Sequence, residues 1–507
     1  MKTIYIFLVP VFFVFYGFGQ TPPSVTPTSA FINYGSNVTL TATGCMGTVN
    51  WSTGQTGASI SVSPKQSARF TATCTSGMQT SGASNSVLVQ VGLTTSPCNS
   101  NVSVSSNLSN IGYRYESNNY IIGTGDIEAN ASVQFKAQNY VQLNPGFEAK
   151  SGGVFKAFTG KCTELQTREV LTGRQLPWEI LWGPDDFIWM TEKGGKISRV
   201  NPQTSAVQTL ITISDVFSNG EGGLLGMVLH PDFANNPYVY VSYNYSIDNT
   251  VSGMRVKVVR FTYNSGTATL GSPLILVQNI LGNSTHDGSR LVITPELKLF
   301  VTTGDAQDLS APQNDTNLNG KILRMNLDGS VPADNPIAGS LVWSKGHRNP
   351  QGLVYANGKL YCSSHGAGIE DEINLIQQAG NYGWPNVEGF CNTPSEITFC
   401  NANSVIEPIF SSGTGGTWAF CGLDYYNNDA YPRWKGHLLL VSLKNQTLYS
   451  LKVSADGNTI EGPANLYLVN QFGRLRDIAI APNGKVYLCT SNGGNADKII
   501  EITPIVE

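Results

Sequence analysis

The chain is poor in charge. Only 13% of its 507 residues are Asp, Glu, Lys or Arg, and the formal net charge is −4. Proteins that bind nucleic acid need a basic face to neutralise phosphates, so this balance argues against nucleic acid as a partner. Helical bundles are usually richer in Glu, Lys and Ala, so the low charge also disfavours an all-α fold.

Long apolar runs are equally scarce. Beyond the first 19 residues, no segment approaches the roughly 20 apolar residues that a membrane-spanning helix requires. Residues 1–19 carry one Lys, an apolar run broken by Pro10 and then small residues, which is the pattern of a secretory signal peptide. The alternative is an uncleaved anchor. We expect a mature chain without a membrane span that is secreted, periplasmic or held at the cell surface.

Gly, Ser, Thr and Asn are abundant instead, with 53 glycines alone. These residues suit short strands joined by tight turns, because Gly supplies positive φ and Asn tolerates it. The composition therefore predicts an all-β chain. Single cores rarely exceed about 250–300 residues, so the length predicts several domains.

The chain has nine cysteines, which can oxidise in an exported protein. Their positions suggest three pairs, although connectivity does not follow from sequence alone: Cys45 with Cys74, Cys98 with Cys162, and Cys391 with Cys400. An odd count leaves at least one free thiol. We interpret the remaining three as small buried apolar residues rather than catalytic groups: Cys362, Cys421 and Cys489.

Two small blocks precede the main one. Residues 21–96 alternate apolar residues with Ser and Thr, as in SNVTLTATGC and SARFTATC, which predicts an immunoglobulin-like sandwich rather than a low-complexity stalk. Residues 98–162 repeat short rungs between Gly and Asn turns, as in a small β-stack, and resemble the coathanger-like modules of secreted bacterial enzymes. Neither block has a catalytic cluster. We interpret both as spacers or as modules that contact glycans or a cell surface.

Residues 168–507 contain a loose repeat of an apolar strand, a turn and an aromatic-rich second strand. Its six copies are EILWGPDDFIWMTE, MVLHPDFANNPYVYVSY, LVITPELKLFVTTGD, GLVYANGKLYCSSHG, HLLLVSLKNQTLYSL and IAIAPNGKVYLCTS. Six copies predict a six-bladed β-propeller, in which loops from distant parts of the chain converge on one face. Function is therefore expected where strands meet loops.

Histidine is rare, and one of the five stands at such a junction. His286, in STHDGSRL, precedes the strand LVITP and can act as a base near neutral pH, although an ordinary surface histidine is the alternative.

Basic groups stand at further junctions: Arg348 with Asn349 in GHRNPQGL, Lys444 in VSLKNQT, and Arg474 with Arg476 in GRLRDIAIAP. We expect Arg474 and Arg476, two apart on a strand, to share a face. If these cations line the channel rather than the outer surface, they predict a polyanionic ligand.

An acidic turn, SSHGAGIEDEINLI, follows. Carbonyls of Gly366, Ala367 and Gly368 are suited to a hard cation, and residues 370–372 supply carboxylates, although acidic turns are also ordinary solvated surface.

From Leu176 to Pro504, about two-thirds of the chain, the sequence closely resembles the soluble glucose and sorbosone dehydrogenases that depend on pyrroloquinoline quinone (PQQ). The segments that carry the resemblance occur in the family's order: ILWGPDD, GLLGMVLHPDFANNPYVYVSY, HDGSRLVITP, GKILRMNLDGSVPADNP, GHRNPQGL, DEINLI, NYGWPNV and RLRDIAIAPNG. The resemblance implies oxidation of an aldose or related sugar to its lactone or acid, with PQQ and Ca²⁺ as cofactors and an external electron acceptor.

The resemblance also implies roles for individual residues. His286 would be the general base, Asp305 would orient it, and Arg348 would stand beside the quinone oxygens. The cofactor carboxylates would be held by Asn349, Lys444, Arg474 and Arg476. Carbonyls of Gly366 and Ala367 would bind the cofactor's calcium, and Glu372 would belong to a second calcium site with backbone oxygens near Glu388 and Phe390.

This chain departs from the family at three places. Glu221 in GEGGLLG replaces Gln and is expected to face the substrate or the catalytic histidine, and Ala367 replaces Pro, which a backbone ligand tolerates. The rim around Thr417, Trp418 and Cys421 is expected to differ, with Trp418 stacking on a ligand or packing in the core. Two other functions are compatible with a propeller: a non-catalytic module that binds carbohydrate or protein, and a calcium-dependent lactonase. The retained base and cations favour the dehydrogenase.

Overall fold

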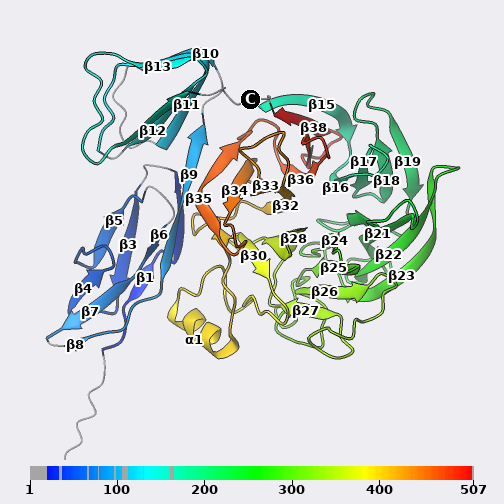
Figure 1. Cartoon of the computed structure of the whole chain (residues 1–507). Helices are drawn as coiled ribbons and strands as arrows, with labels where there is room; N and C mark the ends of the chain where they lie inside the picture. The colour runs from blue at the N-terminus through cyan, green and yellow to red at the C-terminus, as the bar shows by residue number, and fades with distance from the viewer. Residues whose placement is uncertain are drawn as a thin grey trace, which may run out of the picture.

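The computed structural model describes residues 20–33, 37–64, 68–77, 79–95, 99–104, 112–129, 131–159 and 165–504. Within these ranges the regular secondary structure is β-strand, apart from the single helix α1 (Pro394–Asn403). The predicted all-β class is confirmed. Figure 1 shows a ring of sheets with two smaller β modules along one edge.

Six blades of four antiparallel strands form the propeller: five are separate sheets, and the blade of residues 420–467 is part of a larger sheet. Five of them follow chain order from the inner to the outer strand. Their strands are β16 (Pro177–Trp182), β17 (Ile188–Glu192), β18 (Lys196–Val200), β19 (Val207–Thr212), β20 (Leu224–Leu229), β21 (Tyr238–Ser246), β22 (Met254–Asn264), β23 (Thr269–Leu281), β24 (Leu291–Ile293), β25 (Lys298–Thr303), β26 (Lys321–Asn326), β27 (Val342–Lys345), β28 (Pro350–Ala356), β29 (Lys359–Ser364), β30 (Glu372–Ile376), β31 (Phe410–Ser411), β32 (Phe420–Tyr426), β33 (His437–Ser442), β34 (Leu448–Val453) and β35 (Ile460–Tyr467).

The sixth blade joins the two ends of the propeller segment. It consists of β36 (Leu475–Ile480), β37 (Val486–Thr490) and β38 (Asp497–Pro504), and β15 (Leu165–Arg174) pairs antiparallel with β38 as its outer strand. The ring is thereby closed by hydrogen bonds between its first and last strands.

The cores lie between neighbouring blades. Trp189 of β17 packs in one apolar cluster with Met227 of β20 and Phe261 of β22, and all three side chains are buried. Inner strands are covered on both sides by adjacent blades, which explains why they read as short continuous apolar runs. The six inner strands thus present their ends, and the loops that follow them, around one central axis.

One predicted repeat is out of step with the blades. HLLLVSLKNQTLYSL forms β33 and β34, the second and third strands of its blade, whereas the other five copies begin with an inner strand. The inner strand here is β32, and residues 427–436 separate it from β33. No short turn joins β32 to β33. The repeat pattern therefore matched the second and third strands of this blade instead of the first and second.

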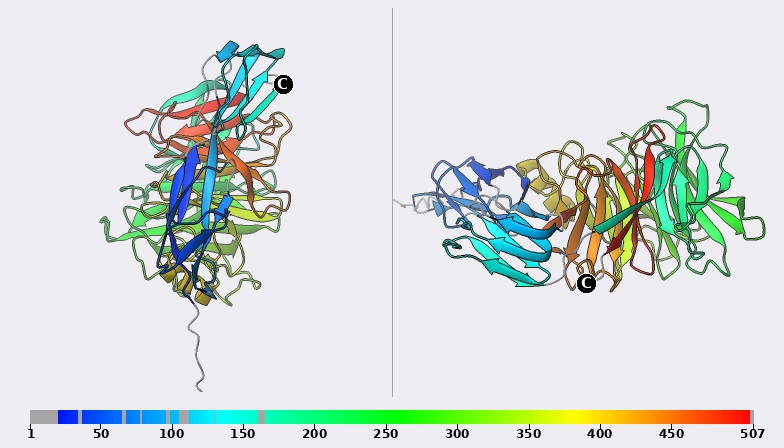
Figure 2. Two further views of the ribbon diagram at one scale, coloured as in Figure 1. Left: turned by 90° about the vertical axis from the view of Figure 1, so that its left-hand side faces the viewer. Right: turned by 90° about the horizontal axis from the view of Figure 1, so that it is seen from above.

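The N-terminal residues form two small sheets and contribute strands to a larger one. The strands are β1 (Ser24–Thr26), β2 (Ser29–Asn33), β3 (Val38–Thr43), β4 (Thr48–Trp51), β5 (Ser59–Val62), β6 (Ala68–Phe70), β7 (Ala72–Ser76), β8 (Gln79–Thr80) and β9 (Val87–Thr95). Val25, Leu40, Val87 and Val89 are among the side chains buried in their common core. This part of the chain lies along one edge of the propeller (Figure 2).

Residues 99–159 follow a different plan, with strands that pair in parallel. These strands are β10 (Asn99–Val104), β11 (Gly112–Gly123), β12 (Ser132–Ala137), β13 (Tyr140–Leu143) and β14 (Val154–Thr159). Like residues stack from rung to rung: the rings of Tyr120 and Tyr140 lie 5.2 Å apart, and Asn139 donates to Asn119 at 2.7 Å.

The N-terminal modules are joined to the propeller by backbone and side-chain contacts. Strand β9 pairs in parallel with β35, so it extends that blade by one more strand. Thr414 of the propeller donates its hydroxyl to the Ser29 carbonyl at 2.8 Å, and Arg433 forms an ion pair of 2.7 Å with the buried carboxylate of Glu116. The modules are therefore packed against the propeller rather than tethered by a linker alone.

Two predicted disulfides are confirmed, Cys45–Cys74 and Cys391–Cys400. Cys98 and Cys162 lie outside the described residues. The remaining three cysteines are free and buried, as predicted. Residues 1–19 also fall outside the described ranges, and no helix within those ranges is long and apolar enough to cross a membrane.

Candidate active site

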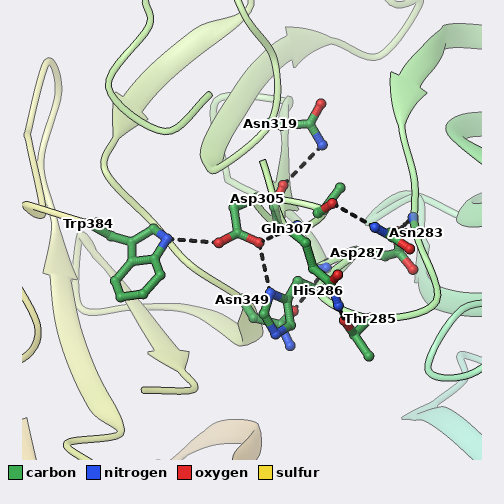
Figure 3. A network of polar contacts seen from close by, with 12 residues as sticks. Asn283, Thr285, His286, Asp287, Asp305, Gln307, Asn319, Asn349 and Trp384 are labelled. Carbon is green, nitrogen blue, oxygen red and sulfur yellow. Dashed lines mark hydrogen bonds and ion pairs between the residues drawn. The ribbon is translucent and has the colours of Figure 1, made fainter. Parts of the chain in front are cut away.

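His286 and Asp305 form a direct pair. His286 lies in the loop between β23 and β24, and Asp305 follows β25 in the same blade. The imidazole Nδ1 lies 2.8 Å from Oδ1 of Asp305; the histidine side chain is 17% exposed and the carboxylate only 1%. Figure 3 shows the two side chains pointing toward one another. The imidazole thus has one edge fixed by a buried acid, while part of the ring stays accessible.

Two further donors hold the Asp305 carboxylate. The indole Nε1 of Trp384 donates to Oδ2 at 2.8 Å, and the backbone N–H of Gln307 donates to Oδ1 at 2.8 Å (Figure 3). Although burial raises its pKa, these bonds and the histidine lower the pKa of Asp305 below its ordinary value. Asp305 therefore stays ionised and is suited to accept a hydrogen bond from the Nδ1–H of His286.

The backbone around His286 is in an unusual conformation. His286 has φ 64°, in the left-handed region that is uncommon for non-glycine residues. The loop packs directly on Gly304, where any Cβ would overlap the carbonyl of His286. Such outliers persist where surrounding contacts over-determine them, and they cluster at active sites.

Glu221 lies beside the pair but binds its backbone rather than its ring. Oε2 of Glu221 accepts the backbone N–H of His286 at 3.1 Å and the side-chain amide of Asn349 at 3.3 Å. Burial raises the pKa of Glu221, but the nearby His365, the bond from His286 and Arg476 outweigh it, so the pKa falls below its ordinary value. Glu221 therefore places a negative charge next to the histidine loop, where a Gln at the same position would be neutral.

The predicted cations form no ion pair with any described carboxylate within 4 Å. These residues are Arg348, Lys444, Arg474 and Arg476. Burial lowers the pKa of the Arg348 guanidinium, which lies 5.4 Å above the Trp384 ring. Desolvated cations without anions are costly, so this part of the molecule is suited to an anionic ligand.

The four cations are placed differently from one another. Arg476 is buried on β36, where its guanidinium donates to Gln351 at 2.6 Å and its Nε has no protein partner among the described residues. Arg474 precedes β36 and is exposed, so strand alternation does not set its direction as we predicted. Lys444 is exposed in the β33–β34 turn, with Nζ 3.5 Å from the Thr417 hydroxyl; it follows the second strand of its blade, and its backbone N–H donates to Trp418, just before the inner strand β32.

Asn349 acts mainly within the protein. It is fully buried; its Oδ1 accepts the N–H of Gly288 at 3.2 Å, and its Nδ2 donates to Glu221. Both ends of the amide are therefore engaged, and Asn349 ties the histidine loop to the start of β28.

The predicted cation-binding turn is held by carboxylates on its N–H side. Gly366 donates its N–H to Oδ1 of Asp371 at 2.9 Å, and Ala367 and Gly368 donate theirs to the same oxygen of Glu388, the latter at 3.1 Å. A Cβ at Gly366 would overlap the Ile369 carbonyl, so only glycine fits there. Because the C=O of one residue points opposite to the N–H of the next, the carbonyls of Gly366 and Ala367 face away from Glu388.

Glu372 already has two partners. It accepts the N–H of Gly389 at 2.8 Å and the amide of Asn374 at 2.8 Å, and burial raises its pKa to about 7. Within the described ranges, no group of three or more His, Cys, Asp or Glu side chains is arranged to hold a metal ion. A cation at the turn would therefore be held chiefly by backbone oxygens, which Ca²⁺ accepts.

Trp418 packs on one side in the core. Its indole stacks on Tyr449 with centroids 5.5 Å apart and an interplanar angle of 8°, while the residue remains partly exposed. Of the two alternatives for Trp418, packing in the core describes the face of the indole that stacks on Tyr449.

Several residues of the site were not predicted. Trp384 lies in NYGWPNV, whose motif was recognised but not its contact with Asp305. Gln351, His365 and Cys421 surround Arg476: Sγ of Cys421 lies 3.7 Å from Nε2 of His365, and burial lowers the pKa of His365 to about 4. Their convergence comes from three blades, so no local sequence pattern could have revealed it.

A histidine–carboxylate pair beside cations that form no ion pair among the described residues, on one face of a six-bladed propeller, is suited to proton abstraction next to an anionic ligand. A family model described as Glucose / Sorbosone dehydrogenase matches residues 174–500. The chain belongs to the glucose/sorbosone dehydrogenase family.

Individual relatives agree with this membership. The chain is 32% identical over 423 residues to quinoprotein glucose dehydrogenase B of Acinetobacter calcoaceticus, which covers 67% of this chain and 88% of that protein. It is 28% identical over 342 residues to an aldose sugar dehydrogenase of Escherichia coli, covering 65% and 90% respectively. Among solved structures, the PQQ-bound aldose sugar dehydrogenase of Streptomyces coelicolor matches with a TM-score of 0.59 and 29% identity, over 68% of this chain and 99% of that one.

Proposed function

We propose that this protein oxidises an aldose or related sugar to its lactone, with PQQ and calcium as cofactors and His286 as the general base. The observation that carries the proposal is the His286–Asp305 pair, 2.8 Å apart, with the unpaired Arg348 close to the same carboxylate. The relatives whose names specify a quinoprotein glucose dehydrogenase and a PQQ-bound aldose sugar dehydrogenase support the same chemistry.

The tautomer of His286 follows from its partner. Ionised Asp305 has no proton to give, so Nδ1 of the imidazole carries the hydrogen of that bond and Nε2 carries the lone pair. Nε2 then takes the proton of the sugar's anomeric hydroxyl, and Asp305 stabilises the imidazolium that forms. PQQ, when bound, supplies the two-electron acceptor for the hydride that leaves the same carbon.

The remaining cations fit the cofactor's anionic groups. Arg348 is the half-buried cation next to the base, so it is suited to oxygens on which negative charge develops. Arg474, Arg476 and Lys444 would bind carboxylates, and the unpartnered Nε of Arg476 fits such a ligand. The amide of Asn349 would hold the neighbouring loop in place. Gly366 and Ala367 carbonyls would hold the calcium.

We also propose a second calcium at Glu372, export of the chain, and glycan or cell-surface contacts through the N-terminal modules. The Glu372 carboxylate lies beside the backbone N–H of Gly389, next to Glu388 and Phe390, whose backbone oxygens are the further ligands proposed. Two disulfides within the described residues support an oxidising compartment.

Reconstitution of the purified apoprotein tests the main proposal. PQQ and calcium are added separately and together, and dye reduction is followed with a panel of aldoses. We expect sugar-dependent turnover only with both cofactors, and its loss in His286→Ala. A matched control is His230→Ala, which changes a histidine that contacts Asp232 and Tyr238 instead. Failure of the wild-type chain to bind PQQ would overturn the dehydrogenase and favour a binding propeller.

A further inference from the structure

One carboxylate oxygen accepts hydrogen bonds from three successive backbone N–H groups at the cation-binding turn. Oε1 of Glu388 accepts the backbone N–H groups of Ala367, of Gly368 at 3.1 Å and of Ile369 at 3.4 Å. Successive backbone N–H groups that converge in this way form an anion-binding concavity. Here the anion is a side chain of the same chain, located in the loop between β30 and α1.

Because the peptide bond is planar, these hydrogen bonds also fix the direction of the neighbouring carbonyls. In a trans peptide the C=O of one residue points opposite to the N–H of the next. When Ala367 and Gly368 direct their N–H groups at Glu388, the carbonyls of Gly366 and Ala367 must point to the opposite side. These are the two carbonyls proposed to bind the cofactor's calcium.

We propose that Glu388 is a positioning residue that orients the Gly366 and Ala367 carbonyls for calcium before the cation binds. The inference rests on the proposed function. It concerns the Glu388 side chain, whereas the second calcium site involves only a backbone oxygen near this residue.

Other contacts keep Glu388 in place. The adjacent Gly389 donates its N–H to Glu372 at 2.8 Å, and the N–H of Glu388 itself lies 3.4 Å from a carboxylate oxygen of Glu396. Glu396 also completes the capping box at the start of α1, and the Cys391–Cys400 disulfide joins the same loop to that helix. The acceptor is therefore held by the β30–α1 loop, and not by the turn that it orients.

Three substitutions separate the role of the acceptor oxygen from that of the charge. Glu388→Ala removes both, Glu388→Gln keeps an oxygen that can accept the N–H groups, and Glu388→Asp shortens the reach. Glu407→Ala is the matched control, because Glu407 accepts a backbone N–H in the same sector, that of Cys391 at 3.0 Å, without contacting the turn.

The measurement is the calcium concentration that gives half of the PQQ absorption change, at saturating PQQ and without sugar. Loss of one charge-assisted contact of this kind corresponds to about a tenfold change in an equilibrium constant. We expect Glu388→Ala to raise the half-saturating calcium about tenfold, Glu388→Gln to raise it less, and Glu407→Ala to leave it unchanged. At saturating calcium, kcat and the sugar KM of Glu388→Ala should return to wild-type values.

An unchanged calcium requirement in folded Glu388→Ala would overturn the positioning role. If Glu388→Ala does not fold, Glu388→Asp and Glu388→Gln decide: wild-type calcium requirements in both would overturn it, and a larger increase in Asp than in Gln would support it. A wild-type chain without any calcium-dependent PQQ spectrum would instead refute the cofactor assignment, a result visible before any variant is made.

Discussion

Trp384 donates its indole N–H to Oδ2 of Asp305 across 2.8 Å. The two residues are 79 positions apart and come from different blades. This bond leaves Oδ1 of the carboxylate for the imidazole of His286, and the face of the same indole lies under Arg348. Trp384 thus links the proposed base to the cation proposed to face the cofactor.

Replacing Trp384 by Phe should slow the chemical step. Phe keeps an aromatic face under Arg348 but cannot donate to Asp305. A hydrogen bond to a charged group is worth about 1.5–3 kcal/mol, so we expect kcat to fall about tenfold or more with little change in the sugar KM. Steady-state kinetics of the holoenzyme measures this, with Trp182→Phe, which stacks on Tyr487 elsewhere in the propeller, as control. An unchanged kcat would contradict the role of the indole.

Replacing Glu221 by Gln should slow turnover. The Gln oxygen can still accept the backbone N–H of His286, but the negative charge beside the loop is lost. The ionised Glu221 attracts the imidazolium that forms when His286 takes a proton, so loss of the charge should lower kcat by up to about tenfold. Steady-state kinetics of the holoenzyme measures this, with the exposed Glu296→Gln as control. An unchanged or higher kcat would show that Glu221 does not stabilise the imidazolium.

Replacing Arg474 by Ala should weaken cofactor binding without affecting the fold. The side chain is exposed and makes no hydrogen bond or ion pair within the described part of the chain, whereas the backbone N–H donates to Asn492 at 2.8 Å and the carbonyl accepts the N–H of Ser491 at 2.8 Å. Loss of one charge-assisted contact predicts about 10- to 100-fold weaker PQQ binding, measured by titration at saturating calcium. Lys435→Ala, which removes an exposed cation paired with Asp429, should bind PQQ normally. Equal affinity of Arg474→Ala and wild type would remove Arg474 from the cofactor site.

The buried carboxyl of Asp287 should make the free energy of unfolding depend on pH. Burial raises its pKa from 3.8 to about 7. Between about pH 4 and pH 7 the Asp287 carboxyl keeps its proton in the folded state and releases it in the unfolded state. The free energy of unfolding therefore falls as the pH rises through this interval. Asn cannot ionise and can still accept the N–H of Asn283, which Asp287 accepts at 2.9 Å.

Thermal unfolding of Asp287→Asn at pH 5 and pH 8 tests this. We expect the variant to gain about 2–4 °C relative to wild type on going from pH 5 to pH 8. Asn349→Asp provides the converse control, because it adds a buried acid to the same network and should lose stability over that interval. A difference between Asp287→Asn and wild type that does not depend on pH would show that Asp287 is ionised in the folded state throughout.

Local patterns were enough for the fold class and for part of the site. The turn APNG between two apolar runs predicts the β36–β37 hairpin, which the structure contains, with Gly484 at φ 81°. The same reasoning located five of the six inner hairpins and the close-range pair Cys391–Cys400. It failed at HLLLVSLKNQTLYSL, because the ten-residue loop 427–436 separates β32 from β33, whereas the short turn between β33 and β34 has the hairpin pattern of the other copies.

The motifs identified His286 and the cations, but closure of the ring sets the distances between them. Trp384 reaches Asp305 only because neighbouring blades bring the two loops together, and Glu388 reaches the Gly366 turn from a loop 20 residues away. The direction of Arg474 and the position of Lys444 likewise depend on where each strand begins. Sequence by itself determined which strands form and which residue types are available for chemistry, since these depend on near neighbours. Tertiary structure decided which of those residues meet, because the packing of blades around one axis sets distances that no local pattern encodes.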